Sequence, residues 1–186
     1  MNWRSYFLSF ELPLTQQLTG VNFIVTQVTQ VTALYDQPLS HFTGLIANFI
    51  QLVSTTFSAY LLAKVGRRTI IVVGTISVGL LTIVIGIVFL ELDKGWKAGF
   101  ALGMALIMVF NVVYGLTLGP VVWLYVPEIA KKKIVPVATA TYWGGCSFSL
   151  IVAPIITTIM HSPYAVFLFF GAYTSAMILP NYFLVE

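Results

Sequence analysis

The chain has 186 residues, of which 59% are apolar and only 8% are charged. Because soluble domains carry about 25% charged residues, this composition excludes an ordinary soluble domain and indicates a polytopic membrane protein. A net charge of +3 and one cysteine argue against nucleic-acid binding, an internal disulfide and a cysteine-based metal site.

Six apolar stretches predict six transmembrane helices in a single domain over residues 1–186. The segments between them contain turn residues or charges: YDQPLS at 35–40, KVGRR at 64–68, ELDKGWK at 91–97, EIAKKK at 128–133 and HSP at 161–163. The predicted spans are residues 6–33, 40–62, 69–90, 98–126, 134–160 and 163–184.

Positive charge is divided unevenly between the two sides of these spans. If both termini lie inside, the inner side carries Arg4, Lys64, Arg67, Arg68, Lys131, Lys132 and Lys133, and the outer side carries Lys94 and Lys97. Short loops rich in Lys and Arg stay on the cytoplasmic side of a membrane. Both termini are therefore expected on the cytoplasmic, or matrix-equivalent, side.

The first two spans carry polar side chains at helical spacing. Those of the first span are Thr15, Thr19, Asn22, Thr26, Thr29 and Gln30, and those of the second are His41, Asn48, Gln51, Thr55 and Ser58. Polar groups in a membrane helix face the bundle interior or a water-filled cavity, because lipid leaves their hydrogen bonds unmade. Two interpretations remain open: hydrogen bonding between helices, or a cavity for a neutral polyhydroxylated ligand, since amides both donate and accept.

Four segments resemble motifs of the sugar-porter branch of the major facilitator superfamily. They are QQLTGVN at 16–22, KVGRR at 64–68, GPVVWLYVPEIA at 119–130 and YFLVE at 182–186. They resemble, in order, the family's seventh-helix signature, its loop between helices eight and nine, its tenth helix with the inner-loop glutamate, and its closing segment. The resemblance covers essentially the whole chain and implies a six-helix C-terminal half, helices seven to twelve, built as two inverted three-helix repeats.

The resemblance also implies roles for individual residues. The implied sugar-binding residues are Gln16, Gln17, Asn22, Gln51 and Trp123. Trp123 has a second interpretation, as an aromatic anchor at the membrane interface. The implied gating and inner-loop residues are Gly66, Arg67, Arg68, Gly119, Pro120 and Glu128. Among these, Gly119 and Pro120 are expected to loosen the tenth helix, because proline removes a backbone hydrogen bond.

The chain departs from the family pattern mainly at the gates. The departures are Thr26 and Gln27 for two outer aromatics, Ala63 for an acid, Val122 for a proline, Val135 for an arginine, Cys146 and Ser147 for an asparagine–tryptophan pair, and Leu184 or Val185 for the closing proline. In the family, inner acidic and basic residues form an ion-pair network that stabilises the outward-open state. Here the inner cations face only Glu128 among inner-loop acids, which predicts an altered balance between two states. Alternatively, Lys131, Lys132 and Lys133 contact anionic lipid headgroups.

The family binds its substrate between two six-helix halves, and this chain resembles one of them. A second copy, a separate N-terminal half, other membrane subunits or further polypeptide is expected to cover the polar faces. The initial methionine and the closing motif favour a discrete product. Two functions therefore remain: a half-size sugar porter that moves a hexose or similar neutral solute with a second half, or a transport-inactive structural subunit of a larger membrane complex.

Enzyme activity, a cofactor and a metal site are not expected, because the sequence contains no nucleophile–base pair, metal-ligand cluster or phosphate loop. The expected partners are the lipid bilayer and a neutral sugar. Glu11 is the one acidic residue inside a predicted span. It is interpreted either as a protonatable group or as an interfacial glutamate that pairs with Arg4 or reaches water. In the proton-coupled sugar porters that the chain also resembles, the proton-binding carboxylate lies on the first helix, in the other half.

Overall fold

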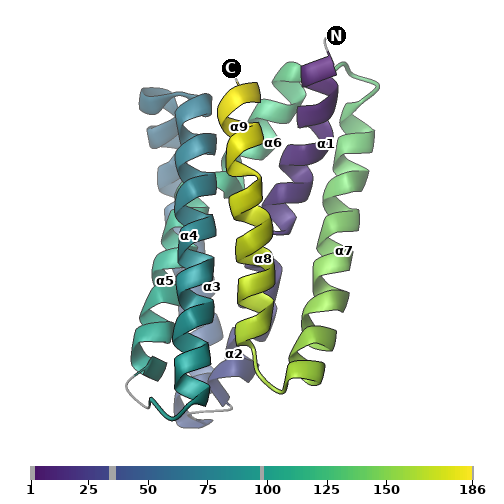
Figure 1. The fold of residues 1–186 in the computed structure, drawn as a ribbon. Coiled ribbons are helices and arrows are strands. Elements are labelled where there is room, and N and C mark those ends of the chain that lie inside the picture. The colour runs from purple at the N-terminus through teal and green to yellow at the C-terminus, as the bar shows by residue number, and fades with distance from the viewer. Residues whose placement is uncertain (1–2, 34–36, 97–98, 186) are drawn as a thin grey trace.

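Helices make up nearly all of the structure, a computed structural model that describes residues 3–33, 37–96 and 99–185. The side chains of residues 26, 27, 30, 31, 37–39 and 41 lie outside this description. The helices are α1 (Trp3–Gln17), α2 (Val21–Ala33), α3 (Gln37–Val65), α4 (Arg67–Asp93), α5 (Gly99–Leu116), α6 (Leu118–Ile129), α7 (Val135–Met160), α8 (Tyr164–Ala176) and α9 (Ile178–Leu184). They run side by side in one bundle, and both termini lie at the same end of it (Figure 1). The described residues contain no strand, so the predicted all-α fold is confirmed.

Five helical stretches among the described residues are long and apolar enough to cross a membrane. They are Phe42–Val65, Arg67–Asp93, Gly99–Ile129, Val135–Met160 and Tyr164–Leu184. These stretches fall on the second to sixth predicted spans. The first predicted span corresponds to α1 and α2, which are 15 and 13 residues long and contain the polar run. The fold is that of a polytopic membrane protein.

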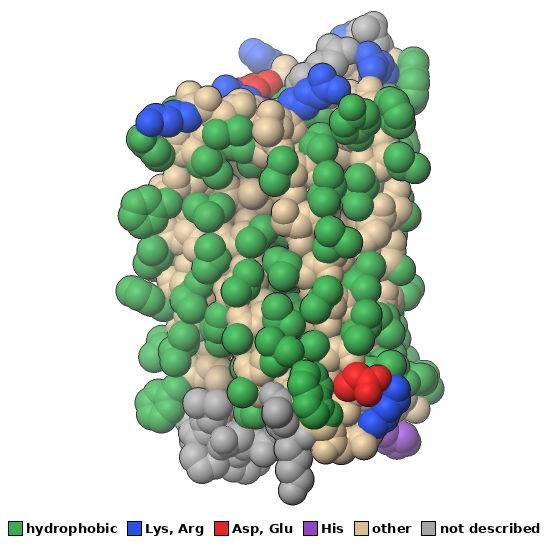
Figure 2. Space-filling model, turned by 60° about the vertical axis from the view of Figure 1, so that its left-hand side comes forward, with side chains coloured by type: hydrophobic (Ala, Val, Ile, Leu, Met, Phe, Trp, Pro, Cys, Tyr) green, Lys and Arg blue, Asp and Glu red, His purple; other side chains and the backbone are tan. Residues whose placement is uncertain are grey.

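The surface of the bundle has the polarity that a bilayer requires. Its sides are mainly apolar, and charged side chains gather at its two ends (Figure 2). Most of the Lys and Arg side chains in this view lie at the end that also holds both termini. Apolar side chains exposed on the sides include Leu45, Leu52, Leu80, Ile151 and Ile159. Lipid chains cover such a surface without the free-energy penalty that water would impose.

A turn divides the first predicted span, so its residues form two helices, α1 and α2, rather than one continuous helix. The turn covers residues 18–20, and Gly20 has a φ of 89°. Side chains with a Cβ rarely adopt this left-handed conformation, whereas glycine does so readily. Because the helix does not continue past Gln17, the residues at 15, 19 and 22 do not lie along one straight helical face. Thr26, Gln27, Gln30 and His41 belong to the predicted stripes and gate, but their side chains lie outside the described residues.

Two further spans are interrupted, and a proline follows each interruption by three residues. Thr117 separates α5 from α6 with φ −119° and ψ −94°, and Pro120 lies in the first turn of α6. Met177 separates α8 from α9, which contains Pro180. A proline lacks the N–H that a continuous helix would donate to the carbonyl four residues earlier, and its ring collides with that carbonyl. Both helices therefore restart just before a proline, and the predicted loosening at Pro120 takes the form of a break.

Buried apolar side chains form two clusters, one toward each end of the bundle. The cluster nearer the termini includes Leu8, Leu12, Ile71, Val121 and Tyr125. The other cluster includes Leu18, Val78, Phe89, Phe110 and Phe170. The residues between Leu12 and Leu18 include Thr15, Gln16 and Gln17, and these polar side chains are also buried. A buried polar layer therefore lies between two apolar clusters, at the level where α1 ends.

Candidate functional site

Gln16 joins the first helix break to the break between α5 and α6. Its side chain, only 1% exposed, lies at the end of α1. Its Nε2 donates a hydrogen bond of 2.6 Å to the carbonyl oxygen of Gly119, two residues after the interruption at Thr117. The sequence separation of 103 residues shows that this contact depends on the fold. Two of the residues predicted at separate motifs, Gln16 and Gly119, are therefore brought together.

Gln17 and Asn22 form a second hydrogen-bonded group, on the side of α7. Gln17 is also 1% exposed, and its Oε1 accepts a hydrogen bond of 2.6 Å from Asn22 Nδ2. The same Nδ2 lies 2.9 Å from the hydroxyl oxygen of Ser149 on α7. A Cβ on Gly145 would lie only 3.1 Å from Gln17 Cβ, so α7 approaches α1 closely here. Gln17, Asn22 and Ser149 thus connect three helices.

One amide atom of each glutamine remains without a hydrogen-bond partner. These atoms are Gln16 Oε1 and Gln17 Nε2, and both are buried. Buried polar atoms in folded proteins nearly always have a hydrogen-bond partner. A buried atom without one lowers the stability of the fold by about 1–3 kcal/mol. One atom accepts and the other donates, which matches a hydroxyl group, since a hydroxyl does both. In this conformation both atoms are enclosed, so a ligand would reach them only after the breaks rearrange.

Gln51 approaches the same region from α3. Its carbonyl oxygen would lie 3.1 Å from a Cβ on Gly115, which is two residues before Thr117. The close approach of α3 to α5 therefore occurs beside the second break. The Gln51 side chain is partly exposed. The backbone of Gln51 therefore lies beside the second break, while its side chain is not enclosed.

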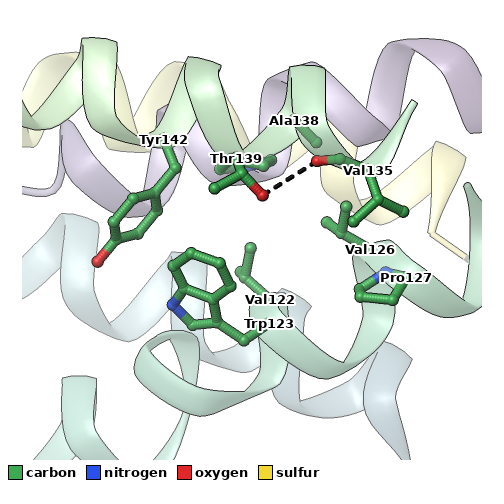
Figure 3. Close-up of a pocket in the computed structure, with 9 residues that line it drawn as sticks. Val122, Trp123, Val126, Pro127, Val135, Ala138, Thr139 and Tyr142 are labelled. Atoms are coloured by element: carbon green, nitrogen blue, oxygen red, sulfur yellow. Dashed lines mark hydrogen bonds between the residues drawn. The ribbon is translucent and has the colours of Figure 1, made fainter. Parts of the chain in front are cut away.

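Trp123 lies one turn after Gly119, on α6, and faces α7. Its ring centroid is 4.5 Å from that of Tyr142, with the two planes at 59°. Figure 3 shows the two rings next to each other at the edge of a small cavity that Pro127, Val135 and Thr139 also line. The cavity measures about 40 Å³, far below the roughly 300–1,000 Å³ of ordinary ligand pockets. The indole is 41% exposed, which is compatible with a place beside a ligand and with an interfacial anchor.

The predicted inner-loop residues gather at the end of the bundle that holds the termini. Gly66, with a φ of 83°, turns the chain from α3 into α4. Arg67 Nη2 then lies 2.9 Å from Glu128 Oε1 at the end of α6. Arg68 Nη2 donates a hydrogen bond of 3.2 Å to the carbonyl oxygen of Tyr182 on α9. These contacts connect α4 to α6 and α9, but they do not reach the glutamines.

Replacing Glu128 with glutamine is expected to lower the free energy of unfolding by less than about 1 kcal/mol. The reason is that the side chains of Arg67 and Glu128 are 48% and 47% exposed, so water and salt screen their attraction. Thermal unfolding in detergent should show a small difference between variant and wild type at low salt. That difference should vanish near about 1 M salt, where the Debye length is only ~3 Å. A loss of several kcal/mol that salt does not change would contradict this account.

Glu11 is buried, which does not fit the interpretation of an exposed interfacial glutamate. Its side chain is 6% exposed. Thr15 Oγ1 donates a hydrogen bond of 2.7 Å to Glu11 Oε1, whereas Oε2 has no hydrogen-bond partner. The helical spacing of α1 turns this residue inward, next to the polar layer. Because it is an ionisable side chain buried beside Thr15 and the two glutamines, Glu11 is a further candidate functional residue.

Ser149 is a further member of this region that the motifs did not indicate. Its hydroxyl contacts Asn22 and donates to its own helix at the carbonyl of Cys146, at 2.9 Å. A serine in a long apolar helix is a usable signal, because hydroxyls in membrane helices usually face other helices. Cys146 itself is half-buried beside it. No cluster of three His, Cys, Asp or Glu residues able to hold a metal lies in the part of the chain that the structure describes.

Comparison with known proteins identifies the family. A family model described as "Sugar (and other) transporter" matches residues 2–186. The chain belongs to the sugar transporter family. It is therefore an integral, multi-pass membrane protein of a family of transporters rather than of enzymes.

Individual members of the sugar transporter family match most of the chain. The chain is 30% identical over 178 residues to the facilitated glucose transporter member 2 of solute carrier family 2 from Mus musculus, covering 91% of the chain and 33% of that protein. It is 27% identical over 176 residues to the facilitated trehalose transporter Tret1 from Apis mellifera ligustica, covering 89% and 34%. It is 27% identical over 176 residues to the major facilitator superfamily transporter mfsA from Aspergillus fumigatus, covering 90% and 31%. The chain spans about a third of the length of these relatives.

Proposed function

We propose that the chain is one six-helix half of a sugar porter, equivalent to helices seven to twelve, and moves a hexose or similar neutral solute together with a second half. The observation that carries this proposal is the pair of helix breaks joined by Gln16 and Gly119. In transporters, interrupted helices in corresponding positions of two repeats are the best indication of a substrate site. The breaks at residues 18–20 and at Thr117 lie in the first helix of each three-helix repeat.

The chemistry of the breaks favours a neutral, hydroxyl-rich ligand. Gln16, Gln17, Asn22 and Ser149 supply uncharged donors and acceptors from three helices. The two unpartnered amide atoms need one donor and one acceptor, which a sugar hydroxyl group provides. The solutes for which two relatives are named, glucose and trehalose, have this chemistry.

Binding requires the breaks to open, because the unpartnered atoms are enclosed here. Turns absorb changes of φ and ψ more easily than continuous helix, and Gly20 gives one of the turns wide freedom. In the open state the Gln16–Gly119 hydrogen bond would be exchanged for bonds to the ligand. The enclosed geometry is therefore assigned to a ligand-free state of the transport cycle.

A second half would cover the two helices that the bundle leaves most exposed. On α3 the exposed apolar side chains include Phe49 and Phe57, and on α7 they include Trp143 and Ile151. The relatives are about three times as long as the chain, so they contain room for another six helices. The cations near both termini favour a cytoplasmic, or matrix-equivalent, location for this end of the bundle.

Reconstitution of the native particle into liposomes tests this function. We expect saturable uptake of labelled D-glucose that an excess of unlabelled D-glucose suppresses and L-glucose does not. The alternative is a transport-inactive, transporter-derived subunit, which the loss of gating residues favours; Val135, for example, stands where the family has an arginine. Absence of uptake and of glucose binding by a correctly folded particle would overturn transport and support that alternative.

A further inference from the structure

Glu11 is a carboxylate held inside the membrane-spanning part of the bundle with one oxygen unused. It is 94% buried, as the 6% exposure of its side chain implies. Oε1 accepts a hydrogen bond of 2.7 Å from the Thr15 hydroxyl, and Oε2 has no hydrogen-bond partner. An ionised carboxylate in apolar surroundings is strongly unfavourable unless a cation or a proton accompanies it. The site is therefore incomplete as it stands.

A cavity connects Glu11 to the surface of the chain between α1 and α8. It measures about 290 Å³ and is lined by Phe7, Phe10, Glu11, Leu14, Tyr173 and Met177. Its oxygen atoms come from Glu11 and Tyr173 alone among these side chains. Ca²⁺ and Mg²⁺ need about six or more oxygen ligands. The lining therefore suits a proton and not one of these metal ions.

The charged and titratable neighbours of Glu11 leave this assignment intact. Tyr173 on α8 shares the cavity. Arg4 lies two turns earlier on α1, about 10 Å along the helix axis, and its Nη2 donates to the carbonyl oxygen of Phe183 at 2.8 Å.

The helices on the other sides of α1 contribute tyrosines. Tyr125 of α6 belongs to the cluster around Leu12, and Tyr142 of α7 lies beside Pro13. Glu128 is paired with Arg67, and Cys146 lies further along α7. Among the described residues, no ion pair involves Glu11.

We propose that Glu11 is a proton-binding site that serves the adjacent sugar site. A proton from water forms an O–H bond at Oε2 and neutralises the carboxylate, and its release restores the charge; no other bond changes. The role in sugar binding rests on the function proposed above, whereas the proton site itself does not.

Thr15 supplies the connection between the two sites. Its hydroxyl donates to Glu11, and the next two residues are Gln16 and Gln17. A charged carboxylate accepts a hydrogen bond more strongly than a neutral carboxylic acid does. Protonation at Glu11 therefore loosens the last turn of α1, which presents both glutamines to the breaks. The protonated and ionised forms should differ in their affinity for sugar.

Covalent labelling tests the proton site without any transport assay. The native particle is treated with dicyclohexylcarbodiimide, an apolar reagent that reacts with protonated carboxyl groups, at a series of pH values. Mass spectrometry of the peptides should find the adduct on Glu11. Above the midpoint, labelling should fall about tenfold for each pH unit. The exposed carboxylate Glu91 at the end of α4 gives the control: Glu91→Gln should leave the labelling of Glu11 unchanged. Absence of the adduct, or labelling that does not change with pH, would overturn the proposal.

The binding of labelled D-glucose separates the proton site from the sugar site. In wild type the affinity should change with pH around the labelling midpoint. In Glu11→Gln, glucose should still bind and the pH dependence should disappear; Thr15→Val should weaken the dependence while Glu11 is still labelled. Wild-type affinity that is independent of pH would overturn the coupling. If glucose does not bind at any pH, the proposed function fails, and the labelling alone decides whether Glu11 binds a proton.

Discussion

Replacing Gly171 with alanine should lower the free energy of unfolding by about 1–3 kcal/mol, and replacing it with leucine should prevent correct folding. A Cβ at this position on α8 would lie 2.7 Å from Ile83 Cγ1 and 2.9 Å from the backbone nitrogen of Ile83 on α4. A side chain can rotate away, but a backbone nitrogen inside a helix moves only with the whole helix. The two helices would therefore have to separate.

The contact between α4 and α8 depends on small residues along its length. A Cβ on Gly86 would lie 2.9 Å from Leu168 side-chain atoms and 3.1 Å from its backbone nitrogen, and one on Gly79 would lie 3.0 Å from the Ser175 hydroxyl oxygen. Close backbone approach through small residues is how membrane helices associate, since lipid offers no hydrophobic driving force between them. Separating the helices at Gly171 therefore weakens the neighbouring contacts as well.

Thermal unfolding in detergent, with gel filtration, measures this effect. Gly144→Ala is the matched control, because it is a glycine within α7 whose added Cβ would meet nothing within 4 Å. Alanine there should leave stability unchanged or raise it slightly, since alanine favours helix by about 1 kcal/mol over glycine. Equal stability of Gly171→Ala and Gly144→Ala would show that α4 and α8 do not pack as described.

Replacing Gln17 with alanine should weaken glucose binding about tenfold or more. The variant removes the unpartnered Nε2 donor and also the Oε1 acceptor that holds Asn22 at 2.6 Å. A lost hydrogen bond of about 1–1.5 kcal/mol corresponds to nearly tenfold in affinity, and two groups are affected here. Equilibrium binding of labelled D-glucose to the native particle gives the dissociation constant directly.

Asn48→Ala is the matched control for the Gln17 variant. Asn48 also carries an amide, but its side chain is exposed on α3 and its Nδ2 donates to the carbonyl of Gly44 on the same helix, at 2.9 Å. Because this amide donates its hydrogen bond within its own helix and not to the buried glutamines, its removal should lower glucose affinity much less than Gln17→Ala does and leave stability nearly unchanged. If Gln17→Ala binds glucose as tightly as wild type while it remains folded, the glutamines have no role in binding.

The membrane class, the helical fold and the location of one break follow from the sequence. Apolar composition and charged connections locate the helices. Pro120 indicates the second break, because any proline lacks the N–H that a continuous helix needs at that position. The break at Gly20 was missed, since polar residues on both sides continue a helical spacing that gives no sign of the turn. Helices often contain an isolated glycine, so a glycine in a predicted helix does not by itself predict a positive φ.

For the site residues too, the sequence predicts neighbours within one segment but not contacts between distant segments. The motif placed Gln16, Gln17 and Asn22 together because they are neighbours in the chain. It could not show that Gln16 bonds to Gly119, or that Ser149 completes the group around Asn22, since these contacts join segments more than 100 residues apart. The burial of Glu11 likewise depends on helices that pack against α1 and on no property of its own segment.

The mass and composition of the native particle test the central claim most directly. The protein should be extracted in mild detergent, weighed by native mass spectrometry, and every co-purifying chain identified. We expect a second six-helix half, supplied by another copy, a separate chain or the same longer polypeptide, facing the exposed sides of α3 and α7. A particle that contains this chain alone, or one built from subunits without a second six-helix half, would contradict the proposal of a shared sugar site.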